Sequence, residues 1–105
     1  MDTKITQTQS IKVPPQNIEA EQMVLGSILL DKNSITKVVD LLYPEDFYNP
    51  AHEKIYKVIL ELYEKHQPID ILTVTNRLKE KKILTDVGGS SYLAEIINLV
   101  TTPSH

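Results

Sequence analysis

The sequence predicts an all-α protein, a compact bundle of about five short helices at roughly 17–30, 33–42, 50–66, 71–82 and 89–100. Three observations support this fold class. Apolar residues recur at helical spacing in each segment, capping residues and prolines precede several of them, and no stretch shows a convincing strand alternation. A chain of 105 residues that is 41% hydrophobic and 24% charged can form one domain with its own core.

The first helix follows Pro14-Pro15, which end an extended arm, and Asn17 is its candidate N-cap. Its apolar residues cover almost the whole circumference, a pattern typical of a helix buried between others. The exception is a polar or bare strip of Glu19, Gln22 and Gly26. We expect this strip to face either solvent or another subunit.

The second helix has side chains able to cap it at 31–34 and apolar residues at helical spacing from Ile35 to Leu42. Pro44 disfavours helical angles at Tyr43 and therefore ends the helix. The following segment, 44–47, is predicted to be a turn that returns the ring of Phe47 to the core.

The third and fourth helices have clear start signals. Asn49 is a candidate N-cap followed by Pro50 at the first helical position, and Asp70 can cap the fourth helix. The third helix carries one apolar face and one charged face, with the i,i+4 pairs Glu53/Lys57 and Glu61/Lys65. A turn through Gly88-Gly89 precedes the fifth helix.

Both ends of the chain differ from the helical segment at 14–100. Residues 1–13 are polar, without periodic apolar residues, and are predicted to form a disordered tail. Thr102-Pro103 repeats the cap-then-proline pattern that normally precedes a helix, so 101–105 is either a ragged tail or the start of a further helix of a longer protein. The chain has no cysteine and no apolar run long enough for a signal peptide or a membrane span, which favours an intracellular protein.

No motif for catalysis or cofactor binding is apparent. Gly88-Gly89 lacks the spacing and the lysine of a phosphate-binding loop. His52 and His66 are separated by about 21 Å along one helix, too far to share a metal ion, so each is interpreted as a helix-terminal or boundary histidine. Glu19 and Glu21 point to different sides and make a poor acid/base pair. We expect no catalytic, cofactor-binding or metal-binding residues.

Nucleic-acid binding is the main alternative. The segment 68–84 resembles the recognition helix of a helix-turn-helix protein, and its possible DNA contacts are Arg77, Lys79, Lys81 and Lys82. These cations scatter around the helix, however, and the net charge of the chain is −3. Both observations weigh against this alternative.

A set of motifs, in this order and spacing, resembles the N-terminal domain of bacterial replicative DNA helicases of the DnaB type over about residues 13–105. The motifs are Pro14-Pro15 with Glu19, Glu21, Leu25, Gly26 and Leu29; Asp46-Phe47-Tyr48; His52 with Ile55 and Tyr56; Pro68-Ile69-Asp70; and Val87-Gly88-Gly89 with Tyr92 and Leu93. Met23 and Ser27 depart from the alanine often present in that family, which should alter local packing more than function.

The resemblance implies a parent protein that is a hexameric, ATP-driven helicase in the cytoplasm, at the replication fork in the nucleoid. ATP and Mg would bind its C-terminal domain, outside this chain. The N-terminal domains would form a collar and, with the hairpin, bind neighbouring helicase subunits, the primase C-terminal domain and the helicase loader. The resemblance also implies that 101–105 is the start of a truncated helical hairpin, the element that follows this domain in the family. Without the hairpin, this fragment should be monomeric or weakly dimeric and bind primase poorly. Possible partner contacts are Tyr43, Tyr48 and Leu60.

Overall fold

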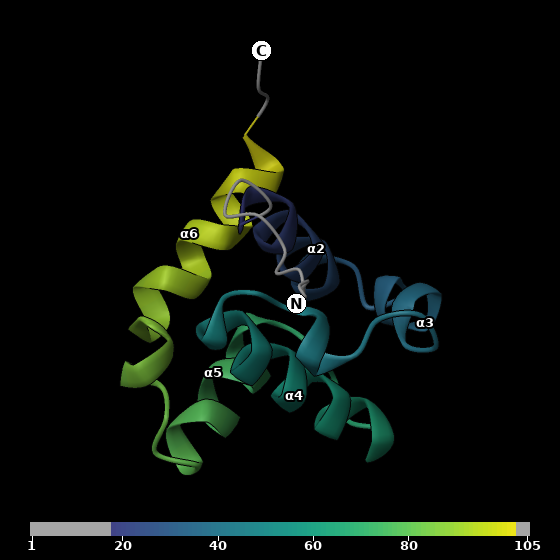
Figure 1. The fold of residues 1–105 in the computed structure, drawn as a ribbon. Coiled ribbons are helices and arrows are strands. Elements are labelled where there is room, and N and C mark those ends of the chain that lie inside the picture. Colours follow the sequence, from purple (N-terminus) through teal and green to yellow (C-terminus); the bar gives the residue numbers. More distant parts are fainter. Residues whose placement is uncertain (1–17, 103–105) are drawn as a thin grey trace, which may run out of the picture.

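The computed structural model describes residues 18–102, which fold into five α-helices and two short 3-10 turns (Figure 1). The helices are α2 (Ile18–Leu30), α3 (Ser34–Val38), α4 (Pro50–Glu64), α5 (Ile71–Glu80) and α6 (Gly89–Thr101). The turns are η2 (Pro44–Asp46) and η3 (Thr85–Val87). The predicted all-α class is confirmed. The cap expected at Asn17, the predicted tail at 1–13 and residues 103–105 of the expected hairpin lie outside the described residues.

The helix α4 is central to the core. It packs against α2, α5, η2 and η3, while α2 packs most extensively against α6, and α3 lies at the edge of the molecule (Figure 1). The buried side of α4 carries Ile55, Tyr56, Val58, Ile59 and Leu62. These residues pack with apolar side chains from the other elements, namely Leu25, Ile28, Leu29, Ile35, Phe47, Ile69, Val74, Leu78, Val87, Leu93 and Ile96.

Local chemistry fixes the starts of α4 and α5. The side chain of Asn49 accepts a hydrogen bond from the Ala51 N–H at 2.8 Å, and Pro50 is the first helical residue. The side chain of Asp70 accepts from the Thr73 N–H at 2.8 Å, and the Thr73 hydroxyl accepts from the Asp70 N–H. Both predicted caps are confirmed, because each is decided by residues adjacent in sequence.

The second predicted helix is shorter than expected, since α3 ends at Val38 and not at 42. The N–H groups of Leu41 and Leu42 both bond the Val38 carbonyl, which tightens the chain into a turn. The Leu42 carbonyl accepts from the Tyr56 hydroxyl of α4 at 2.8 Å. A contact from a distant helix therefore holds the turn. Of the residues expected to cap this helix, Asn33 makes no side-chain cap bond, whereas the Asp31 side chain accepts from the Asn33 N–H at 3.0 Å.

The predicted return of Phe47 to the core is confirmed. Its ring is buried and lies 5.2 Å from the ring of Tyr56, centroid to centroid. The backbone turns through Gly88 at φ +107°, a left-handed conformation that glycine adopts without strain. A Cβ at Gly88 would also lie 2.8 Å from the Cβ of Tyr92. Gly88 therefore lets the chain turn directly into α6.

Candidate functional site

A buried polar network joins α2, α4 and α6. One carboxylate oxygen of Glu21 lies 2.7 Å from His52 Nδ1, and the other accepts from the Tyr48 N–H at 2.7 Å. The opposite nitrogen of His52, Nε2, lies 2.6 Å from the hydroxyl of Tyr92. Gln22 donates to the same hydroxyl at 3.0 Å. The His52 side chain is completely buried, so this network belongs to the core.

The pattern of donors assigns the protons. Because Gln22 already donates to the Tyr92 oxygen, the Tyr92 O–H is free to donate to Nε2 of His52. The proton of His52 then resides on Nδ1 and is donated to Glu21. Every polar atom in this chain of bonds has a partner, which removes the desolvation penalty of burying it.

The prediction for His52 needs correction, and the prediction for His66 is confirmed. His52 is not a boundary histidine, because it is enclosed between Glu21 and Tyr92 and stacks on the Tyr92 ring at 5.9 Å. Glu21, in the first turn of α2, interacts favourably with the helix dipole and is in addition buried, where it accepts a bond from the backbone N–H of Tyr48. His66, in contrast, is exposed just after α4, with a positive φ of 57°.

The strip of Glu19, Gln22 and Gly26 was expected to face solvent or another subunit, and this expectation is wrong for two of the three. Gln22 bonds Tyr92 of α6, and Gly26 is buried against the same helix. A Cβ at position 26 would lie 2.6 Å from Val100 Cγ2 and 2.9 Å from a backbone carbonyl oxygen of α6. Only Glu19 is exposed. The strip is the contact surface through which α2 and α6 approach closely.

A carboxylate on α4 holds two of the four cations proposed to contact DNA. Glu61 bonds Arg77 at 2.6 Å and Lys81 at 3.4 Å, in addition to the predicted partner Lys65 at 3.1 Å. These bonds, led by that from Arg77, lower the pKa of Glu61 from 4.5 to about 2. The same pairing raises the pKa of Arg77. Glu61 thus ties α4 to α5, and it pairs directly with Arg77 and Lys81.

The remaining candidate contacts lie at the surface. Lys79 and Lys82 are exposed and do not join the Glu61 cluster. Tyr43 is 54% exposed and Tyr48 is 43% exposed, one on each side of η2. Leu60 is half-buried against the core. Exposure makes the two tyrosines accessible to a partner, and their role as contacts stays a prediction.

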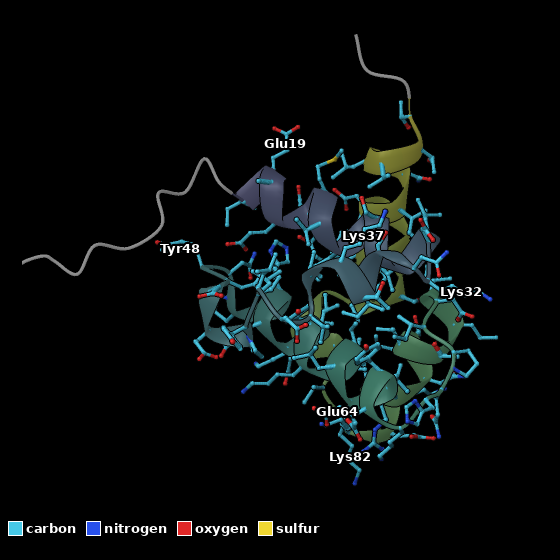
Figure 2. All side chains as sticks on the ribbon, turned by 90° about the vertical axis from the view of Figure 1, so that its right-hand side faces the viewer. Glu19, Lys32, Lys37, Tyr48, Glu64 and Lys82 are labelled. Atoms are coloured by element: carbon cyan, nitrogen blue, oxygen red, sulfur yellow. The ribbon has the colours of Figure 1, made fainter. Side chains whose placement is uncertain are left out.

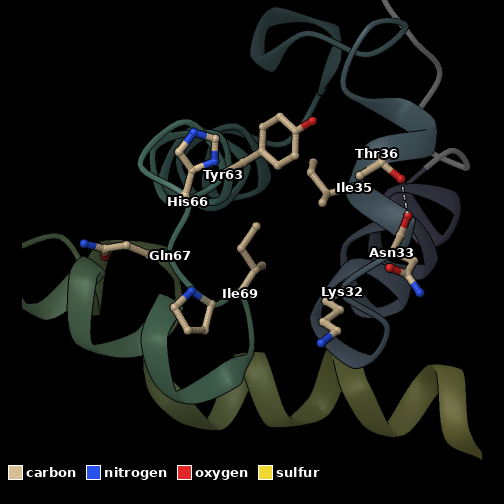
Figure 3. Close-up of a pocket in the computed structure, with 9 residues that line it drawn as sticks. Lys32, Asn33, Ile35, Thr36, Tyr63, His66, Gln67 and Ile69 are labelled. Carbon is tan, nitrogen blue, oxygen red and sulfur yellow. Dashed lines mark hydrogen bonds between the residues drawn. The ribbon is translucent and has the colours of Figure 1, made fainter.

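Two surface grooves border the short helix α3. The larger, of about 450 Å³, lies between α3 and the connection from α4 to α5; Figure 3 shows Lys32, Tyr63 and His66 around it. The second, of about 270 Å³, lies between α2 and α3 and is mainly apolar. Within residues 18–102 no group of three or more metal-ligating side chains is found, and none of the described helices is long and apolar enough to cross a membrane.

Fold and side-chain chemistry together define a small all-α domain in which the ionisable groups that are buried serve the fold. The chain matches the family described as DnaB-like helicase N terminal domain over residues 13–105. This chain therefore belongs to the DnaB-like helicase N-terminal domain family.

Individual relatives agree with this assignment. The replicative DNA helicase DnaC of Bacillus subtilis is 46% identical over 94 residues, which cover 90% of this chain and 21% of that protein. The replicative DNA helicase DnaB of Geobacillus stearothermophilus is 42% identical, with 91% and 21% covered. The crystal structure of the N-terminal domain of DnaB helicase from Mycobacterium tuberculosis superposes with a TM-score of 0.80 at 44% identity, covering 86% of this chain and 65% of that one. The chain thus spans about a fifth of the length of these full-length relatives.

Proposed function

We propose that this chain is the N-terminal domain of a hexameric, ATP-dependent replicative DNA helicase, in which it serves assembly and protein docking. The observation that carries the proposal is the family match over residues 13–105, together with relatives that are replicative helicases. The domain would contribute to the N-terminal collar of the ring. It would also help to bind primase and the helicase loader in the cytoplasm, at the replication fork.

The buried network supports a role without catalysis for this domain. Glu21, His52 and Tyr92 form the only hydrogen-bonded carboxylate–histidine–hydroxyl chain within residues 18–102, an arrangement that serves proton transfer in many enzymes. Here both nitrogens of the imidazole are already bonded, and the ring has no exposed surface. A substrate could reach it only after α6 had separated from α2 and α4. The network therefore supports a structural role.

The charge distribution supports protein docking over DNA binding. Two of the four candidate DNA contacts, Arg77 and Lys81, are held by Glu61, and the chain carries a net charge of −3. Phosphate binding depends on cations that can replace the counterions of DNA. We therefore expect no salt-sensitive retention of DNA by this domain, and no turnover of Mg-ATP.

The decisive experiment is a calorimetric titration with the primase C-terminal domain of the same bacterium. The titration uses this chain and, in parallel, a version extended through the next two helices of the parent protein. We expect the extended version to bind at least about ten times more tightly, a difference of about 1.4 kcal/mol. If neither version binds, the docking role in primase recruitment is wrong.

The oligomeric state provides a second test. We expect this chain to be monomeric or weakly dimeric at micromolar concentration, because the hairpin that pairs these domains in the family is expected to lie beyond it. Light scattering measures the mass directly. A stable hexamer of the chain alone would contradict this expectation.

A further inference from the structure

The helix α2 presents an apolar surface that the described part of the chain leaves open. Its sequence is apolar on almost every side, yet Met23 is 39% exposed and Leu30 is 47% exposed. Apolar helices of this kind are normally enclosed by other helices. The inner side of α2 is covered by α4 and α6, whereas part of its outer side forms one wall of the α2–α3 groove. The residues lining that groove are Met23, Val24, Ser27, Ile28, Ser34, Lys37 and Val38.

The groove is small and mainly apolar. Its volume of about 270 Å³ is below the roughly 300–1,000 Å³ of typical small-molecule sites. Four of its seven lining residues are apolar, and the polar ones are two serines and one lysine. Such a groove suits a few side chains projecting from one face of a helix, the mode in which amphipathic helices bind.

The one charged residue that lines the groove, Lys37, favours an occupant that carries a carboxylate. In a protein with a net charge of −3, no carboxylate is among the lining residues. Lys37 is exposed at the rim, and within residues 18–102 it forms no ion pair. Figure 2 shows Lys37 near the middle of the molecule, with Lys32 to its right. An acidic partner would meet this lysine in a groove whose lining residues carry no carboxylate.

A second copy of the chain fits less well. An isologous dimer formed across this groove would place the same surface patch on both sides of its interface. That interface would contain two copies of Lys37, and the groove residues include no carboxylate to pair with them, which opposes association. An apolar helix that carries carboxylates avoids this conflict.

We propose that the α2–α3 groove is the docking site for an amphipathic helix of a protein partner, which packs apolar side chains against Met23 and Val24 and places a carboxylate beside Lys37. This inference rests on the proposed function, because the partner is sought among the proteins that the domain recruits. It adds the surface and the chemistry of the contact.

The test measures binding of the primase C-terminal domain to the full-length parent protein and to its single-substitution variants. Fluorescence anisotropy reports the binding during each titration. We expect Lys37→Glu to weaken binding about ten-fold or more, through charge repulsion. Met23→Ser should weaken it by a similar factor, because it removes an exposed apolar side chain that lines the groove. Both sites are exposed, so thermal unfolding should show that the variants remain folded.

Two matched controls lie on α5, outside the groove. Lys79→Glu makes the same change of charge at an exposed lysine, and Leu72→Ser removes an apolar side chain that is 66% exposed. Both should bind like the unchanged protein. Binding by Lys37→Glu at full strength, or an equal loss in Lys79→Glu, would overturn the proposed surface while leaving the docking function intact. Failure of the unchanged protein to bind would overturn both.

Discussion

The carboxylate of Glu21 offers the sharpest test of how this domain is held together. In Glu21→Gln the side chain keeps its length but loses its charge and one acceptor oxygen. The carboxylate receives two bonds of 2.7 Å, from the Tyr48 N–H and from His52 Nδ1. An amide can accept only one of them and would direct an N–H group at the other donor. His52 could resolve this conflict only by moving its proton to Nε2, which faces Tyr92.

The size of the effect follows from these bonds. A hydrogen bond to a charged group contributes about 1.5–3 kcal/mol, and a donor left buried without a partner costs about 1–3 kcal/mol. With one of the two bonds lost and the other weakened, we expect Glu21→Gln to lower the free energy of unfolding by about 2–4 kcal/mol. In a domain of this size that lowers Tm by about 10–25 °C.

The matched control is Glu19→Gln, because Glu19 lies in the same first turn of α2 but is exposed. Loss of its favourable interaction with the helix dipole should cost about 0.3–1 kcal/mol. Urea and thermal unfolding, followed by circular dichroism, measure both variants. If the two substitutions destabilise the domain equally, the carboxylate of Glu21 acts only on the helix dipole, and its bonds to Tyr48 and His52 add nothing to stability.

Three further predictions concern packing, pH and capping. Gly26→Ala should lower the free energy of unfolding by about 1–3 kcal/mol despite the better helix propensity of alanine, because the new Cβ would clash with Val100 and a backbone carbonyl. Ser27→Ala is the control, and a higher Tm for Gly26→Ala would contradict the prediction. Glu61, with its pKa lowered to about 2, should stabilise the domain fully above about pH 4.5 and lose this contribution as the pH falls toward 2. Between pH 4.5 and 2, Glu61→Gln should therefore lose less stability than the unchanged protein. Asn49→Ala should cost about 1 kcal/mol in urea unfolding, and no loss would mean that Pro50 alone sets the start of α4.

Features decided by neighbouring residues were predictable from the sequence. The caps at Asn49 and Asp70 and the glycine turn before α6 each depend on residues within a few positions, and all were found where expected. The helix α3 was predicted too long because its end depends on the Tyr56 hydroxyl, which comes from a different helix. Hydrophobic periodicity is a property of one segment, so it cannot predict a contact between two helices.

The buried network escaped prediction for a related reason. His52 lies 31 residues from Glu21 and 40 from Tyr92, so no local pattern brings them together. A signal was nevertheless present, because Gly26 stands inside an otherwise apolar helix, and an isolated helical glycine can mark a close approach of backbones. Gly26 indicated that another segment packs closely against α2, but it could not identify that segment as α6. The open groove beside Met23 was missed because a helix apolar on most sides was expected to be covered.

The same network bears on how the domain folds as it leaves the ribosome. The last partner of the network to be synthesised is Tyr92 of α6. Its hydroxyl, which accepts a bond from Gln22, follows Gln22 by 70 residues in the chain. Until α6 has been synthesised, Nε2 of His52 and the surface around Gly26 have no protein partner. A nascent chain that ends at α5 therefore cannot complete its core, and α2 stays exposed to solvent or chaperones. We expect the domain to become protease-resistant in one late step, when α6 docks.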